Sequence, residues 1–469
     1  MRVQLFVAAA LLTAAPLVVP AQTLISDSLI ATYSQQELFN LGLTDATSGL
    51  TVHCLRYATL DATGSPTVAS GAIVVPAADS CYRALACYLH GTIVERDGVP
   101  SRLGDEIIVG YYLAAAGFVG VLPDLLGLGD SPGLHPYVHA ASEASCTVDM
   151  LRAAREFCDQ QGVWLNGQVF LAGYSQGGHA CAAAQRLIEE QHSDEFELVA
   201  SAPCSGPYDI SGVQAQVMLD TVPYPAPYYL PYVVLAYGEV YPGLFNNVSE
   251  VFRAPYDMLL PPLFDGTHGA GDINAVLPDV PSEIMQDSVL QAFAADPMHP
   301  FRLALADNDL YDWAPETPTR LYYCDGDDHV FHENSLVALQ SFQTNGSTAV
   351  TGVNIGQLDH GGCAFPALLS VKNWFSSLQG DCTWNSVPEH ARQPWSLRSN
   401  LVIDRTEVVG PANVAAEWSL LDAAGRVRDR GRTLGPFQVD MSGSVPGVYW
   451  LRLEAQDQVT VLRFLVVRP

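Results

Sequence analysis

Short apolar runs alternate with longer amphipathic stretches along most of the chain, from about residue 28 to residue 380. Runs of this kind, bounded by Gly, Pro or Asp, are typical of strands buried in a mostly parallel sheet. The clearest predicted strands lie at residues 84–89, 119–122, 169–172, 198–202 and 321–323. Helix patterns lie between them at residues 144–160 and 178–191. This alternation predicts an α/β fold with a doubly wound sheet.

Residues 207–315 interrupt this alternation. They contain few strand-like runs and many Pro and Tyr residues, as between Tyr224 and Tyr232. A segment of this length is too long for a loop in a compact domain. We therefore expect an inserted, largely helical cap over the site, and the alternative is an irregular excursion without a role.

The pattern changes again near the C-terminus, after Trp384. Residues 385–396 are polar and contain two prolines, which is typical of a linker, so the preceding catalytic domain is expected to span residues 22–384. Residues 397–469 then show period-two alternation broken by turn signals, which predicts a small β-sandwich. Its strands are expected at residues 401–403, 418–421, 437–439, 448–453 and 459–467.

The first 21 residues have the pattern of a signal peptide. Arg2 supplies a positive charge, an apolar run follows, and small residues end the segment at Ala21. The apolar run is short for a membrane span, so a membrane anchor is the weaker alternative. We expect a secreted or cell-surface protein, in which the ten cysteines can form disulfides.

The formal net charge is −28, and Lys372 is the only lysine. A surface this acidic repels phosphates, so neither nucleic acid nor an anionic membrane is an expected partner. We expect a monomer that acts on a small-molecule or lipid substrate without a cofactor.

Gly173-Tyr174-Ser175-Gln176-Gly177 matches the G-x-S-x-G nucleophile elbow, with a predicted strand before it and a predicted helix after it. Ser175 is therefore the predicted nucleophile. The same pattern recurs around Ser131, but there the next residue is Pro132. Proline has no backbone N–H to donate to an oxyanion, so Ser131 is interpreted as a loop residue.

The second oxyanion donor is expected from the loop after the strand at residues 84–89, where His90-Gly91-Thr92 follows. The backbone N–H groups of Thr92 and Gln176 would form the oxyanion hole, and the Thr92 hydroxyl offers a further donor. The alternative is that Gly91 only makes the turn.

The catalytic base is expected after the nucleophile and after the acid in chain order. His360 follows the last predicted strand of the region, at residues 352–355, in a glycine-flanked loop ahead of a helix pattern that starts at Pro366. His360 is therefore the predicted base.

The acid is less sharply defined, because Asp325, Asp327 and Asp328 crowd the turn after the strand at 321–323. The spacing favours Asp327, with Asp325 and then Asp328 as alternatives. Oxygen-rich turns also bind calcium, which leaves a structural calcium open, but we expect no catalytic metal. Cys324 and Cys363 flank the acid and base loops, and a disulfide between them is a hypothesis.

Taken together, these motifs resemble the α/β-hydrolase superfamily, and more narrowly the secretory lipase group related to lipase A. The resemblance rests on His90-Gly91-Thr92, the segments 123–129 and 135–137, the elbow at 173–178, residues 324–330, and residues 359–363. The group often has Tyr where this chain has Leu125. The resemblance implies carboxylic ester hydrolysis by a Ser-Asp-His triad, with the cap setting acyl length.

The tail resembles a type IX secretion sorting domain, through residues 422–427 and 446–449. This implies export by the type IX secretion machinery, and a carbohydrate-binding module is the alternative. For the catalytic part, a serine peptidase or a plant-wall acyl (feruloyl or acetyl) esterase would use the same triad. A surface binding protein on an inactive scaffold is the remaining alternative.

Overall fold

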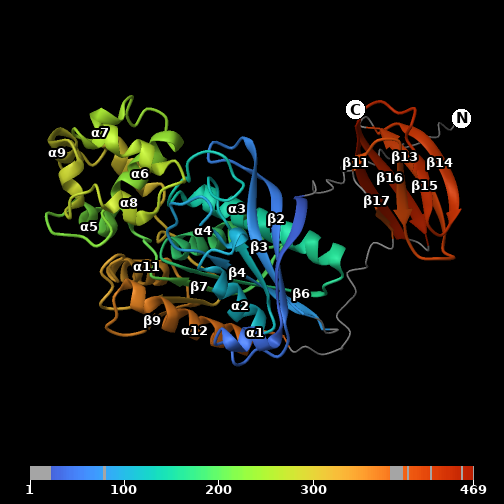
Figure 1. Ribbon diagram of the computed structural model, residues 1–469, viewed down its shortest axis with the longest axis horizontal. Helices are drawn as coiled ribbons and strands as arrows, with labels where there is room; N and C mark the ends of the chain where they lie inside the picture. The colour runs from blue at the N-terminus through green and yellow to red at the C-terminus, as the bar shows by residue number, and fades with distance from the viewer. Residues whose placement is uncertain are drawn as a thin grey trace, which may run out of the picture. The chain divides into compact units, whose positions relative to one another are not determined.

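The computed structural model describes residues 23–77, 81–380, 395–398, 401–422, 425–455 and 458–467. The expected signal peptide and nearly all of the expected linker lie outside these residues. The chain divides into two compact units, residues 1–384 and 385–469 (Figure 1). Each unit is described by itself.

The first unit is built on a nine-stranded mixed sheet with the order β1-β2-β3-β5-β4-β6-β7-β8-β9. Strands β1 to β3 and the β3–β5 pair are antiparallel, and the pairs from β5 to β9 are parallel. The strands are β1 (Leu24–Tyr33), β2 (Leu50–Leu60), β3 (Pro66–Pro76), β4 (Arg83–Leu89), β5 (Val119–Pro123), β6 (Leu165–Tyr174), β7 (Glu197–Cys204), β8 (Thr319–Tyr323) and β9 (Val350–Asn354).

The parallel half of the sheet contains the strands predicted from apolar runs. Strands β2 and β3 are the longest of this sheet, and β1 leaves most of its side chains at least partly exposed. An exposed edge strand needs no continuous apolar run, so its sequence carries a weak strand signal.

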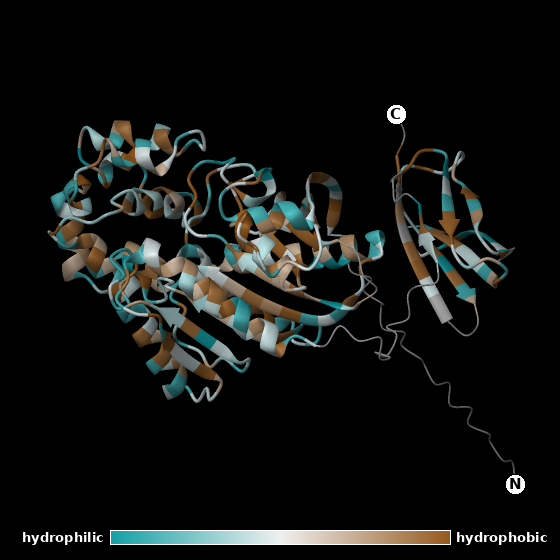
Figure 2. Ribbon diagram, turned by 60° about the horizontal axis from the view of Figure 1, so that its bottom comes forward, coloured by the Kyte–Doolittle hydropathy of each residue, from teal (hydrophilic) through white to brown (hydrophobic). Residues whose placement is uncertain are grey.

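Helices cover both faces of the sheet, which confirms the doubly wound α/β arrangement. One face carries α1 (Gln35–Asn40), α2 (Ile107–Ala115) and α12 (His360–Leu378), and the other carries α3 (Ala140–Gln161), α4 (Gln176–Gln191) and α11 (Glu333–Thr344). Side chains alternate along β6: Phe170 packs with the α12 side, whereas Val169 and Leu171 pack with the α3–α4 side. The strands are accordingly hydrophobic along much of their length (Figure 2).

The cap is a helical insertion, as predicted. Its helices are α5 (Ala215–Leu219), α6 (Tyr229–Val240), α7 (Tyr256–Leu259), α8 (Ala270–Asn274), α9 (Asp287–Ala295) and α10 (Pro300–Ala306), which gather on one side of the first unit in Figure 1. They enclose an apolar core of their own around Tyr237 and Phe252. Tyr237 donates a 3.0 Å hydrogen bond to the Val138 carbonyl, which ties the cap to the catalytic part.

The second unit consists of two sheets that are antiparallel except for the β11–β17 pair. Three strands form one sheet, β10 (Ser396–Leu397), β12 (Arg405–Val409) and β15 (Phe437–Asp440). Five form the other, β11 (Leu401–Val402), β17 (Gln458–Val466), β16 (Gly447–Ala455), β13 (Ala415–Asp422) and β14 (Val427–Leu434). Trp395 and Leu451 lie in the core between them. No helix in the described part of either unit has the length and apolar character needed to cross a membrane.

Candidate active site

Ser175 lies at the sharp turn between β6 and α4. Its backbone has φ 59° and ψ −121°, a strained conformation for a residue with a side chain. A β-carbon at Gly177 would lie 1.8 Å from the Leu89 carbonyl oxygen, and one at Gly173 would lie 1.9 Å from the Gly177 carbonyl oxygen. Both glycines are therefore required for the close approach of strand and helix at this elbow.

Ser131, the second match to the pattern, lies in a loop between β5 and α3. Its side chain is buried, and its carbonyl oxygen accepts a hydrogen bond from Arg96. No helix begins directly after it. The local structure of a nucleophile elbow is therefore present at Ser175 and missing at Ser131.

The loop after β4 lies against Ser175, the predicted nucleophile. A β-carbon at Gly91 would lie 3.8 Å from Ser175 Cβ. The Gly91 N–H donates to the carboxylate of Glu106, at 3.0 and 3.1 Å from its two oxygens. In contrast, the N–H groups of Thr92 and Gln176 donate to no protein acceptor among the described residues. Both groups remain available for a substrate oxygen. The Thr92 hydroxyl is hydrogen-bonded to the Tyr137 hydroxyl at 2.8 Å.

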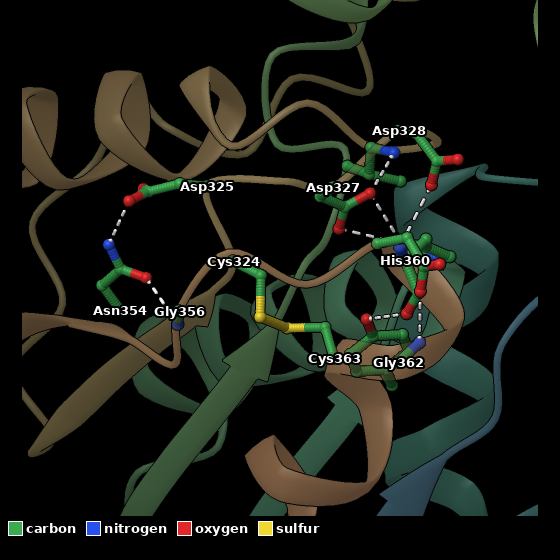
Figure 3. Close-up of a disulfide and its surroundings, with 12 residues drawn as sticks. Cys324, Asp325, Asp327, Asp328, Asn354, Gly356, His360, Gly362 and Cys363 are labelled. Carbon is green, nitrogen blue, oxygen red and sulfur yellow. Dashed lines mark hydrogen bonds and ion pairs between the residues drawn. A yellow bond between two sulfur atoms is a disulfide. The ribbon is translucent and has the colours of Figure 1, made fainter.

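The predicted base and the favoured acid are in contact. His360 Nδ1 lies 2.9 Å from each carboxylate oxygen of Asp327, and both side chains are buried. The other two aspartates have different partners (Figure 3). Asp325 accepts from the Asn354 amide at 2.7 Å, and Asp328 accepts from the backbone N–H of His360 at 3.1 Å. Of the three aspartates, Asp327 alone binds the imidazole.

The helix that carries the base begins earlier than the sequence predicts. It starts at His360 itself, and Pro366 lies within it. Asp359 caps the helix, because its carboxylate accepts the Gly362 N–H at 2.7 Å. This N-terminal cap by Asp359 fixes the direction in which the first helical residue, His360, leaves the loop.

A disulfide joins Cys324 to Cys363 (Figure 3). Cys324 directly follows β8, and Cys363 lies in the first turn of α12. The bond therefore links the loop of Asp327 to the helix that begins at His360, as hypothesised. Among the residues that the structure describes, no three His, Cys, Asp or Glu side chains are grouped to hold a metal ion.

Tyr174, the residue before Ser175, contacts His360. The Tyr174 hydroxyl donates to the His360 carbonyl at 2.5 Å, and the two rings lie 5.0 Å apart. In the described part of the chain, Ser175 Oγ and His360 are not hydrogen-bonded to each other. Such bonds are often long without substrate and shorten when it binds.

A family model for the alpha/beta hydrolase family matches residues 89–366. The chain belongs to the alpha/beta hydrolase family. Among solved structures, this hydrolase is similar to the rice cell wall degrading esterase LipA from Xanthomonas oryzae, with 33% identity and a TM-score of 0.68. That similarity covers 76% of this chain and 97% of LipA.

Two further structures extend the comparison. A Legionella pneumophila protein has 29% identity and a TM-score of 0.70, covering 76% of this chain and 97% of its own. Candida antarctica lipase A has 14% identity and a TM-score of 0.58, covering 77% of this chain and 84% of its own, and shares the fold alone. A search of curated proteins gave no match. The esterases among the solved relatives support an ester hydrolase.

Two glutamates of the site carry no sequence signal. Glu106, the residue before α2, holds Gly91, and Glu143 of α3 lies beside Gln176, and no motif marks either glutamate. Their positions next to the elbow depend on how α2 and α3 pack on the sheet.

The buried His135 predicts a pH dependence of the hydrolase's stability. Burial lowers the pKa of His135 to about 4 from an ordinary 6.5. As the pH falls from 6.5 to 4, the unfolded chain binds a proton at His135 that the folded chain does not. The free energy of unfolding should therefore fall by about 3 kcal/mol over this range. Urea unfolding across this range would measure the effect. His135→Gln, which cannot titrate, should destabilise the hydrolase most at neutral pH and less as the pH falls. An equal effect at all pH values would contradict the prediction.

Proposed function

We propose that this hydrolase is a serine carboxylic ester hydrolase with Ser175 as nucleophile, His360 as base and Asp327 as acid. The observation that carries the proposal is an apolar pocket that opens at Ser175. The pocket has about 900 Å³ of space not filled by atoms, counting its open mouth. Ser175 and Gln176 line it on the catalytic side, and apolar side chains of the cap line the rest.

The proposed reaction has two halves. His360 accepts the proton of Ser175 Oγ while Ser175 bonds to the ester carbonyl carbon, and the N–H groups of Thr92 and Gln176 donate to the resulting oxyanion. The bond to the alcohol then breaks, and His360 gives the alcohol its proton. Water then attacks the acyl group in the same way, which releases the carboxylic acid product and restores Ser175. Asp327 orients His360 throughout.

The pocket favours substrates with an apolar acyl group. Its cap side includes Val289, Leu290 and Phe293 of α9, and Phe301 and Leu305 of α10. Burial of each additional methylene in such a pocket contributes about 0.8 kcal/mol. Of the tyrosines that the sequence places in the cap, Tyr229 lines the pocket.

The experiment is labelling of Ser175 by a fluorophosphonate, followed by turnover of p-nitrophenyl esters with acyl chains of two to sixteen carbons and of a peptide panel. We expect one phosphonate per chain, attached to Ser175, and faster turnover of esters than of peptides. An unlabelled chain, or label on another serine, would contradict the proposed nucleophile.

Narrowing the pocket should change chain-length preference without harming the chemistry. Val289→Trp fills part of the cap side, so kcat/KM for a dodecanoate ester should fall at least about 10-fold, while that for an acetate ester stays within about 3-fold. Met298→Trp is the matched control, because Met298 is an exposed cap residue that does not line the pocket. Equal losses on both esters would argue against an acyl site here.

A second candidate substrate comes from the similarity to LipA, which is described as a rice cell wall degrading esterase. It is an ester of the plant wall, such as a feruloyl or acetyl group on a polysaccharide. Methyl ferulate and acetylated xylan belong in the same assay. Turnover of these above that of apolar acyl esters would favour this second candidate.

The export route remains a proposal. We propose that residues 1–21 direct secretion and that the C-terminal unit is a type IX sorting domain, which would place the hydrolase outside the cell. The motif segments at 422–427 and 446–449 support this assignment. Expression with and without residues 397–469 in a host with the type IX machinery would test it, by the amount of hydrolase outside the cells.

A further inference from the structure

The side chain of Gln176 is held from two sides directly beside the nucleophile. Its amide nitrogen lies 2.6 Å from His135 Nε2 and 3.0 Å from Glu143 Oε1. All three side chains are buried. His135 belongs to the His135-Pro136-Tyr137 segment, one of the motifs that carry the family resemblance but have no part in the proposed reaction.

The hydrogen-bond partners fix which atom of the amide faces this cluster. His135 Nδ1 lies 2.6 Å from the Leu126 carbonyl, which can only accept, so Nδ1 carries the proton. The lowered pKa of His135, caused mainly by burial, keeps the ring neutral, and its Nε2 must accept. Both hydrogens of the Gln176 amide are thus used, one on His135 and one on Glu143.

Glu143 is held in turn by His179. His179 Nδ1 lies 2.6 Å from Glu143 Oε2, and His179 Nε2 donates to the Asn308 carbonyl at 2.9 Å. Burial alone would lower the pKa of His179, but the Glu143 carboxylate, together with the Asn308 carbonyl and Asp309, outweighs burial and raises it. The imidazolium form can donate through both nitrogens, so His179 and Glu143 form a buried ion pair.

These features cost folding free energy. A buried ion pair has a large desolvation penalty, and the oxygen of the Gln176 amide is buried without a hydrogen-bond partner among the described residues. An apolar side chain at position 176 would avoid both the unpaired acceptor and the need for its partners. The unpaired oxygen and the ion pair are thus both costs of holding the side chain of Gln176, whose backbone N–H is the proposed oxyanion donor.

We propose that Glu143 is a positioning residue that, with His135, fixes Gln176 so that its N–H points at the oxyanion. This inference rests on the proposed function. Gln176 is the first residue of α4. Few rotatable bonds lie between its side-chain amide and its backbone, so a side chain held from two sides restricts the direction of the backbone N–H. The ion pair with His179 holds the Glu143 carboxylate in place.

The test compares two substitutions of Glu143. Glu143→Leu removes the acceptor, so kcat should fall about 10- to 100-fold with KM within about 3-fold. Affinity for an alkylboronic acid, which forms a tetrahedral adduct on serine, should fall by a similar factor. Glu143→Gln can still accept from Gln176 through its oxygen and donate to a neutral His179 through its nitrogen. It should keep kcat within about 3-fold of the wild type.

The controls separate positioning from folding. Glu156→Leu makes the same change on the same helix, but Glu156 binds the backbone of Thr23 and Leu24, so its kcat should stay unchanged. Gln176→Met removes the interaction from the other side and leaves the ion pair intact, which keeps the test open if Glu143→Leu does not fold. The double variant should lose no more kcat than the worse single one.

Several outcomes would overturn the inference in a wild-type enzyme that hydrolyses esters. These are a kcat near wild type in folded Glu143→Leu and Gln176→Met, a loss confined to KM, a loss of the same size in Glu143→Gln, or additive losses in the double variant. A wild-type enzyme without ester turnover would instead contradict the proposed function.

Discussion

Ser175→Ala is expected to lower kcat/KM for a p-nitrophenyl ester by at least about 10⁴-fold. Without the hydroxyl no acyl-enzyme can form, and only binding and the oxyanion donors would remain. The fold should tolerate the change, because the strained φ of 59° belongs to the backbone and the substitution removes a single oxygen. Steady-state kinetics of the purified variant, with its folding checked by circular dichroism, would measure the loss.

Ser131→Ala is the matched control. Ser131 lies in the same sequence pattern and is also buried, but it has neither the strand–turn–helix setting nor a following N–H. Its kcat/KM should stay within about 3-fold of the wild type. Activity lost in Ser131→Ala and kept in Ser175→Ala would reverse the assignment.

Asp327→Asn is expected to lower kcat by about 10³- to 10⁴-fold. Both oxygens of Asp327 face His360 Nδ1 at 2.9 Å, so the carboxylate fixes the tautomer in which Nε2 can accept a proton from serine. An asparagine can present its amide nitrogen to Nδ1, which favours the opposite tautomer. The KM should change little, because Asp327 does not line the substrate pocket.

The neighbouring aspartates provide controls for this variant. Asp325→Asn should keep kcat within about 3-fold, because Asp325 binds Asn354 at 2.7 Å. Asp328→Asn should show an intermediate loss of up to about 10-fold, because Asp328 holds the backbone of His360 rather than its ring. An Asp325→Asn variant as inactive as Asp327→Asn would contradict the assignment.

Local patterns were sufficient to predict the parallel strands and the elbow, because a buried strand needs an apolar run and the elbow needs its glycines. Spacing alone favoured Asp327 over the other two aspartates without excluding them. Their partners depend on where Asn354 and the His360 backbone lie in the fold. The start of α12 was missed because Pro366, which lies in the second turn of the helix, looks in sequence like the beginning of a helix.

The residues around Gln176 show why the rest could not be predicted. Glu143 and His179 come from two helices, and each is an ordinary polar residue in its own segment. His135 lies in a loop, in a motif whose role the sequence leaves open. Their contacts arise from the packing of α3 against α4, which depends on the whole sheet. Strand β1 carries a weak signal for a different reason, because exposed positions interrupt its apolar pattern.

The bond between Cys324 and Cys363 has a consequence for biosynthesis. The thiols of a newly made chain are separate, so at that stage the acid loop and the base helix are held together by noncovalent contacts alone. Closing the bond is a maturation step that needs an oxidising compartment. In the oxidised chain the segments that carry Asp327 and His360 are joined covalently. A chain purified under strong reductants would lack this bond.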